Sequence, residues 1–154
     1  MVSAKLVIQI ETQWEAIHSR FVRLMRTSQA LPTLQQLPES ELQEACRRIL
    51  RNLGHWLVSS SEADIARMYE QVGRERFAQR IPLSQAIRAV QLMRQATTDY
   101  IRDEGVFESS VDLYAEEELE HELARFFDLL VFYLARGFED SDRKLSHTAG
   151  GGRG

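Results

Sequence analysis

Cysteine and proline are scarce in this sequence, which contains Cys46 as its single cysteine and only Pro32, Pro38 and Pro82 as prolines. With one cysteine the chain cannot form an internal disulfide, and a reducing compartment is favoured. No stretch approaches the roughly 18 consecutive apolar residues that a membrane span requires, and no signal-peptide pattern opens the chain. We therefore expect a cytoplasmic protein without a membrane span.

An excess of positive charge is also missing. The 154 residues include 19 Lys and Arg against 23 Asp and Glu, which gives a net charge of −4. Binding to nucleic acid needs a clustered positive surface, and here the basic residues are spread among acidic ones. We therefore expect no nucleic-acid partner. The length suits one domain that buries a single core.

Motifs for nucleophilic, phosphate or dinucleotide chemistry are absent as well. The sequence holds no G-x-S-x-G, no G-x-x-x-x-G-K-[ST], no G-x-G-x-x-G and no paired C-x-x-C. Cys46 lies on the apolar stripe of its predicted helix, so we expect a buried thiol there and not a nucleophile. No catalytic residue is predicted, and we expect that the protein is not an enzyme.

Two Glu-x-x-His pairs, Glu15 with His18 and Glu118 with His121, have the spacing that holds two irons in ferritin-like bundles. The second pair points away from the apolar stripe of its helix, and no glutamate lies between residues 83 and 102 to complete such a site. His18 is the one histidine close to an apolar face, as a haem ligand would need to be. We predict no cofactor and no metal, and keep a haem or di-iron bundle as the alternative function.

Apolar residues recur at steps of three and four along most of the chain, whereas strand and hairpin signals are missing. This pattern predicts an all-α bundle of four to five amphipathic helices. Ser40, Ser61 and Ser84 are the expected N-caps, and Gly105 and Gly137 the expected helix ends. The predicted helices cover about 4–27, 40–59, 61–80, 84–105 and 111–137.

The residues after the predicted last helix are polar and end in a glycine-rich run. Such a composition is typical of a flexible segment and not of a core. We therefore predict a single sensor or interaction domain over residues 1–139, followed by a flexible tail or linker over residues 140–154.

Two arginines fall on the apolar faces of predicted helices. Arg76 lies one turn beyond Val72, and Arg94 lies one turn after Val90. One interpretation is that their stems cover apolar surface while the charges reach water. The other is that they are semi-buried and paired with acidic residues, among which Asp128 is a candidate together with Glu70 and Glu75, since a buried arginine needs such a partner.

Aromatic residues spread around the predicted last helix more widely than one buried face requires. Phe127, Phe132, Tyr133 and Phe138 form the set that we predict as a candidate interface. At ~100° per residue, Phe132 and Tyr133 lie on sides of the helix outside the main apolar stripe. Exposed apolar surface of this kind suggests a homodimer contact. The alternative is that the other helices surround this one and bury every ring.

Three segments together carry a family resemblance. They read Gly73-Arg74-Glu75-Arg76, then Ile81-Pro82-Leu83-Ser84, and in the last helix Arg125-Phe126-Phe127-Asp128. With the helix pattern around them, they resemble the RsbRD N-terminal domain family, the helical input domain of RsbT co-antagonist type. The resemblance covers roughly residues 6–139, and its motifs are loose.

The resemblance implies a function. The family stands ahead of STAS domains in stressosome proteins and ahead of histidine kinases and other bacterial signalling modules. A related class at the same position is globin-like and binds no haem. The resemblance therefore implies a dimeric, non-catalytic sensor or interaction domain. Together with the aromatic surface, it leads us to expect a dimer through the last helix that acts on a signalling protein partner or a fused effector domain. It carries over no ligand-binding residues.

Overall fold

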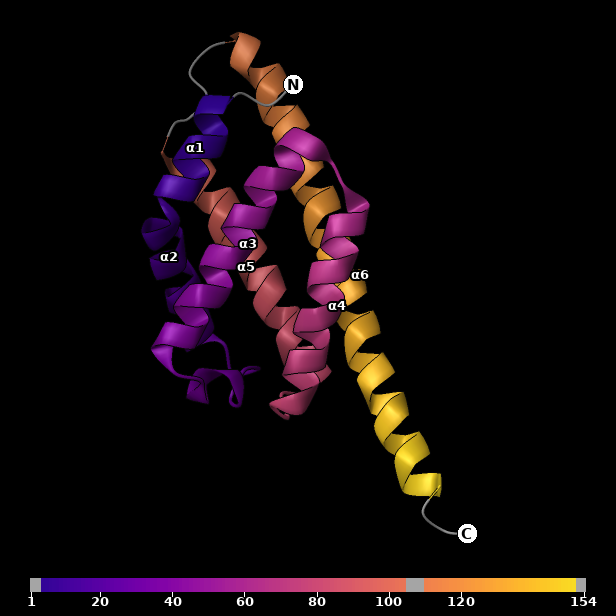
Figure 1. Ribbon diagram of the computed structural model, residues 1–154. Coiled ribbons are helices and arrows are strands. Elements are labelled where there is room, and N and C mark those ends of the chain that lie inside the picture. Colours follow the sequence, from indigo (N-terminus) through magenta and orange to yellow (C-terminus); the bar gives the residue numbers. More distant parts are fainter. Residues whose placement is uncertain (1–3, 105–109, 152–154) are drawn as a thin grey trace.

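A computed structural model of the chain describes residues 4–104 and 110–151, and these residues form six α-helices and one 3-10 helix without a strand (Figure 1). The all-α prediction is confirmed. The helices are α1 (Ala4–Thr12), α2 (Trp14–Thr27), α3 (Glu39–Ser59), α4 (Glu62–Ala78), α5 (Leu83–Asp103) and α6 (Ser110–Gly151), with the 3-10 helix η1 at Leu34–Gln36.

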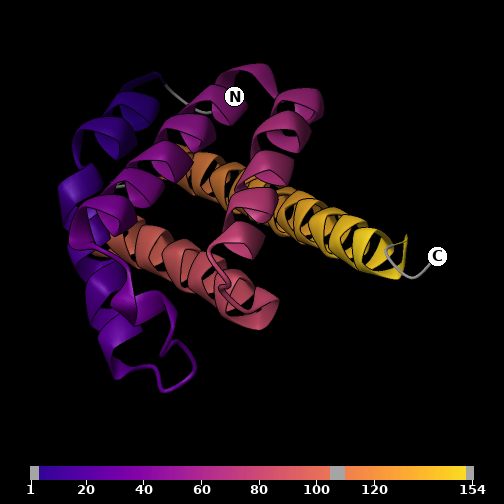
Figure 2. The same cartoon turned by 60° about the horizontal axis from the view of Figure 1, so that its bottom comes forward.

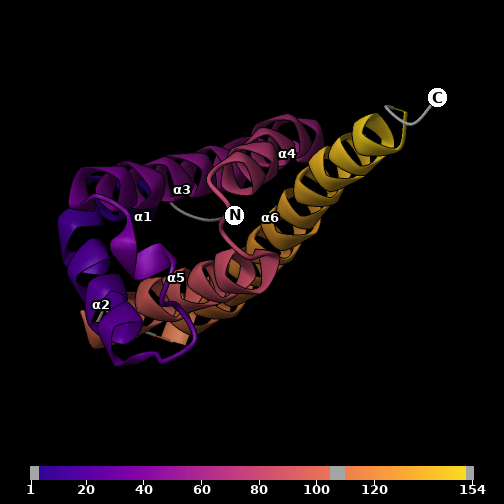
Figure 3. The same ribbon diagram turned by 90° about the horizontal axis from the view of Figure 1, so that it is seen from below.

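The helices surround one core. Seen from below, α3 and α4 lie along one side, α5 along the opposite side and α2 across one end (Figure 3). The most extensive packing is that of α4 on α6, followed by that of α2 on α5, and Figure 2 shows α4 crossing over α6. The largest fully buried side chains come from all six of these helices and from two loop positions: Trp56, Tyr69, Phe126, Phe127, Ile10, Ile17, Leu31, Leu50, Leu53, Ile81, Met93 and Leu119.

The predicted first helix is interrupted. Gln13 has φ −97° and ψ 23°, outside the α-helical region, and separates α1 from α2. The prediction of one continuous helix over 4–27 is therefore wrong. The interruption has a packing reason, because α1 lies mainly against α3 whereas α2 lies mainly against α5. Because α1 and α2 pack on different helices, the chain changes direction between them.

The N-cap of α4 is the one predicted from sequence. Ser61 has an extended backbone, and its hydroxyl oxygen accepts a hydrogen bond from the Asp64 backbone N–H at 3.4 Å. Such a cap satisfies one of the donors that a helix start leaves without an intrahelical partner. The predicted cap is confirmed.

The two other predicted caps are wrong. Ser40 and Ser84 each lie second in their helices, because Pro38 and Pro82 occupy the N-cap positions with ψ near 140° and the helix begins at the next residue. Neither cap position forms a side-chain hydrogen bond. Helix α5 ends at Asp103, and its predicted end at Gly105 lies outside the described residues.

Helix α6 does not end at Gly137. It continues to Gly151 and is 42 residues long, so that its last part extends past the other helices (Figure 1). Gly137 lies inside the helix and is buried. From residue 142 to residue 148 all side chains are exposed. The described part of the predicted tail is thus helical, and the division into a domain over 1–139 and a tail or linker over 140–154 stays a prediction.

Candidate functional site

Helices α4 and α6 touch through their backbones where two glycines meet. A Cβ atom added to Gly73 would lie 2.1 Å from the carbonyl oxygen of Leu134, and one added to Gly137 would lie 2.0 Å from that of Glu70. Both distances are far below any contact that a real Cβ makes. The two glycines therefore permit a helix crossing that no other residue would allow.

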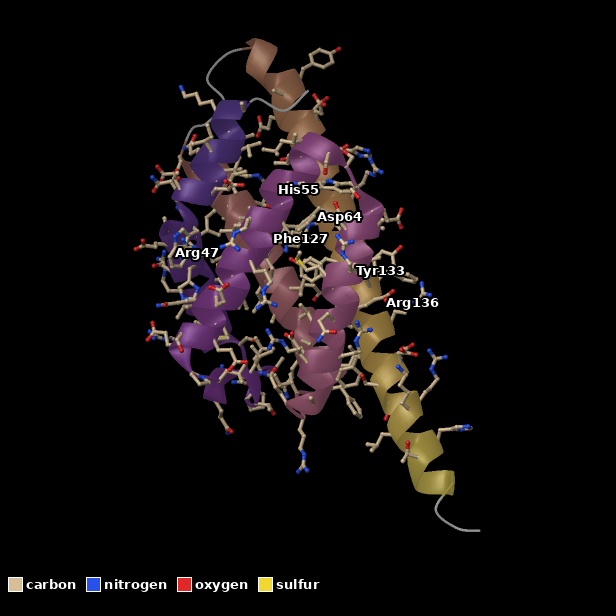
Figure 4. All side chains as sticks on the ribbon, in the orientation of Figure 1. Arg47, His55, Asp64, Phe127, Tyr133 and Arg136 are labelled. Atoms are coloured by element: carbon tan, nitrogen blue, oxygen red, sulfur yellow. The ribbon has the colours of Figure 1, made fainter. Side chains whose placement is uncertain are left out.

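Side chains hold this glycine crossing on both sides. Toward the start of α4, the Tyr133 hydroxyl donates a hydrogen bond to Glu62 Oε1 at 2.7 Å, and this bond is the main reason why the pKa of Tyr133 is raised. Toward the end of α4, the rings of Phe77 and Phe138 meet edge to face with centroids 5.3 Å apart. Figure 4 shows Tyr133 on the side where α6 meets α4. The contact between α4 and α6 thus extends over most of α4.

Next to the crossing, the bundle holds a partly open cavity of about 60 Å³. Its wall is apolar except for two arginines, Arg48 from α3 and Arg76 from α4. The other lining residues come from α2, η1 and α3 to α6: Phe21, Leu34, Leu42, Ala45, Cys46, Ile49, Tyr69, Val72, Ala86, Ala89, Val90, Met93, Leu130 and Leu134. The sequence patterns do not reveal this cavity.

Arg76 is the semi-buried charge at this cavity. Its side chain is 14% exposed, and its Nη1 lies 3.7 Å from Glu41 Oε1. Burial lowers the pKa of Arg76 first of all, and the nearby positive charge of Arg48 lowers it further, while Glu41 and Glu75 act in the opposite direction. Arg48 in turn lies 3.8 Å from Glu75. The nearest acid of Arg76 is thus Glu41 from α3, which was not among the candidates.

The second predicted charge pair lies at the surface. Arg94 Nη1 is 3.6 Å from Asp128 Oδ1, but Asp128 is exposed and the Arg94 side chain is about half exposed. An exposed pair of this kind contributes little to stability, typically about 0–1 kcal/mol. We therefore give this pair no part in the cavity.

The four candidate interface aromatics occupy three different environments. Phe127 is 2% exposed and lies within the bundle, so it belongs to the core and is dropped from the interface (Figure 4). Tyr133 and Phe138 are half-buried against α4. Phe132 is 57% exposed and lies beside Tyr133, with ring centroids 5.0 Å apart. Phe132 is thus the ring of this set that a second chain could cover without rearrangement.

Cys46 is buried in the cavity wall, where its Sγ lies 3.6 Å from the Met93 sulfur. Burial raises the pKa of Cys46 to about 12, which keeps the thiol protonated and unreactive at neutral pH.

His18 is buried between Trp14 and Phe21, and neither ring nitrogen has a hydrogen-bond partner among the described residues. Burial lowers the pKa of His18, against the opposing effect of Glu39, and favours the neutral ring. Of the two Glu-x-x-His pairs, Glu15, Glu118 and His121 are exposed. Within residues 4–104 and 110–151, no group of three or more His, Cys, Asp or Glu side chains is placed to hold a metal ion.

The site and the fold define an all-α bundle with an apolar cavity beside its longest helix. Residues 15–150 match the RsbT co-antagonist protein rsbRD N-terminal domain, a family of signalling input domains, and the chain belongs to this family. The family resemblance predicted from the residues is confirmed. No curated protein and no solved structure matches the chain. No described helix combines the length and the apolar character needed to cross a membrane.

Proposed function

We propose that this chain is a non-catalytic, cytoplasmic input domain of bacterial signal transduction. It dimerises through α6 and passes changes in helix packing to a C-terminal protein partner or a fused effector domain. The observation that carries the proposal is α6 itself, which packs on α4 through the glycine crossing and then extends beyond the bundle as the same helix. Membership of a family of signalling input domains supports it.

A continuous helix suits such transmission. At 1.5 Å per residue, the 42 residues of α6 span about 60 Å, and the part from Gly137 at the crossing to the end at Gly151 spans about 20 Å. A stimulus shifts the arrangement of α6 only if it binds two arrangements unequally. The backbone contact at Gly73 and Gly137 has little room to deform continuously, so a change there moves α6 between discrete positions.

The dimer contact is proposed on the exposed side of α6 around Phe132. A phenyl ring that is 57% exposed on the helix that leads out of the bundle supports a contact with a second chain. In a two-fold dimer the same surface would be used by both copies, so the two α6 helices would lie against each other. Two output helices held together in this way give a partner one paired element to bind.

Replacement of Phe132 and Tyr133 together by Asp tests this interface. We expect the wild-type chain to be a dimer by light scattering and the double variant, shown to be folded by circular dichroism, to be a monomer, because the carboxylate at position 132 would be buried at the contact. Val58→Asp is the matched control, since Val58 is 78% exposed and lies on α3 and not on α6. A double variant that stays dimeric would show that this interface is wrong.

A further inference from the structure

The cavity beside α6 is apolar over most of its wall. Fourteen of the sixteen residues that line it are apolar or aromatic, and the sulfur atoms of Cys46 and Met93 meet in that wall. Cavities with such walls favour apolar groups over water, and ligand sites in proteins commonly join an apolar pocket to a few polar groups that fix orientation. The interior of this cavity therefore suits a small hydrocarbon group.

The polar groups of the cavity are two guanidinium ions that lack a hydrogen-bonded carboxylate. Arg76 and Arg48 lie 3.7 Å and 3.8 Å from their acidic neighbours, beyond hydrogen-bond distance. The hydrogen bond of Arg76 goes instead to the neutral side chain of Gln79, at 2.7 Å. Two positive charges at one cavity repel each other, and a carboxylate between them would accept the forked hydrogen bonds that guanidinium ions donate.

The volume limits the size of the ligand. A protein cavity of roughly 150 Å³ binds benzene, with six carbons. At the same packing, about 60 Å³ holds a group of roughly two or three carbons. We propose that this cavity binds a short-chain monocarboxylate, such as propionate or butyrate, with its carboxylate between Arg48 and Arg76 and its tail against the apolar wall.

The cavity shares residues with the glycine crossing. Leu134 of α6 lines the cavity, and its carbonyl oxygen is the atom that a Cβ added to Gly73 would meet first. Val72 of α4 lines the cavity next to Gly73. A bound carboxylate would therefore press on α4 and α6 one residue away from their crossing. That this contact changes a signalling output rests on the proposed function, whereas the binding itself does not.

Binding is tested by NMR titration of the whole chain with sodium butyrate, at constant pH and ionic strength. We expect saturable shifts of the Met93 methyl signal, which a Met93→Leu variant identifies. Titration with 1-butanol tests the same tail without a charge, and titration with sodium formate tests the charge without the tail. We expect both compounds to bind at least about tenfold more weakly than butyrate, because butanol lacks the carboxylate and formate lacks the apolar tail. No saturable shift with butyrate, or equal binding of butanol, would overturn the proposal.

Substitutions inside and outside the cavity test where the ligand binds. We expect Arg76→Gln to weaken butyrate binding about tenfold or more, while Arg88→Gln, which removes an exposed arginine of α5, leaves it unchanged. Ala89→Leu adds volume at the cavity wall and should abolish binding with both arginines in place. Since Arg76→Gln could unfold the chain, Ala89→Leu keeps the proposal testable by itself. Undiminished binding in folded Arg76→Gln or Ala89→Leu protein would refute the assigned site.

Failure of this inference is distinguishable from failure of the proposed function. A wild-type dimer that is dissociated by the Phe132 and Tyr133 substitutions but binds no butyrate would refute the ligand and leave the proposed function standing. A monomeric wild-type chain that binds butyrate would refute the dimer of the proposed function and leave the ligand inference standing.

Discussion

Replacement of Gly137 by Ala should separate α4 from α6 and destabilise the chain. The new Cβ would lie 2.0 Å from the Glu70 carbonyl oxygen and 2.7 Å from both the carbonyl carbon and the Cα of that residue. All three atoms belong to the backbone of a packed helix, so they cannot move aside as the end of a side chain could. For the new Cβ and the Glu70 carbonyl oxygen to reach an ordinary van der Waals distance, the helices must move apart by more than 1 Å. Gly73→Ala meets the same obstacle from the other side, at Leu134.

The size of the effect follows from two opposing contributions. Overpacking of a well-packed site costs typically about 1–3 kcal/mol, and a backbone obstacle places this site at or above the upper end. Alanine is better than glycine inside a helix by about 1 kcal/mol, which offsets part of that cost. We therefore expect each variant to lose about 2 kcal/mol or more of unfolding free energy. For a chain of this length such a loss corresponds to a decrease in Tm of roughly 4–8 °C.

Gly54 supplies the matched control. It is a buried helix glycine too, but a Cβ there would meet the end of the Glu11 side chain at 2.4 Å, and this side chain can rotate away toward solvent. Gly54→Ala should therefore be neutral or stabilising by up to about 1 kcal/mol. Thermal and urea unfolding followed by circular dichroism would compare the three variants. Equal stability of Gly137→Ala and Gly54→Ala would refute the backbone contact between α4 and α6.

Two further predictions concern buried titratable groups. Because burial lowers the pKa of His18, the unfolded chain takes up a proton below about pH 6.5 that the folded chain does not, so the unfolding free energy should fall between pH 7.5 and pH 5.5. In urea titrations the unfolding free energy of His18→Leu should fall less over this pH range than that of the wild type. An equal fall would contradict the assignment of the pH dependence to His18. With a pKa of about 12, Cys46 should react with a disulfide reagent at neutral pH far more slowly in the folded chain than in the urea-unfolded chain, and equal rates would contradict its burial.

Much of the fold could be predicted from sequence because apolar spacing reports directly on the buried face of a helix. Ile65, Tyr69 and Val72 recur at helical steps in α4, and all three are buried. The interruption at Gln13 could not be found in this way. Apolar residues keep helical spacing on both sides of it, and the change of direction is imposed by two different neighbouring helices.

Gly137 shows how one residue supports two interpretations. A glycine near the end of an apolar pattern often terminates a helix, and this was the prediction. A glycine inside a helix costs about 1 kcal/mol relative to alanine, so its presence also indicates a packing reason. Gly73 lies in the middle of a strong helical pattern and carries the same signal. The partner of each glycine lies on another helix, which spacing within one segment cannot identify.

The candidate site was predictable only in part. The position of Arg76 on an apolar face left a semi-buried charge as one of two interpretations, and the structure places its side chain at 14% exposure. Its neighbour Glu41 and the second arginine, Arg48, come from α3 and required the tertiary structure. The cavity is formed by residues of five helices and η1, so no single segment encodes it. Phe127 was assigned to an interface because the number of helices around α6 could not be counted from sequence.

The most direct test of a dimer joined through α6 is oxidation of variants that each carry one introduced cysteine on its exposed face. Cys46 is buried and should stay unreactive, so cysteines introduced one at a time at Asp128, Phe132 or Arg136 report on α6 alone. A disulfide forms only where two Cα atoms come within about 7 Å, which on a two-fold dimer means near the symmetry axis. We predict a covalent dimer for at least one of these variants and none for Val58→Cys on α3. Cross-linking of Val58→Cys with no cross-linking on α6 would contradict the proposed role of this helix.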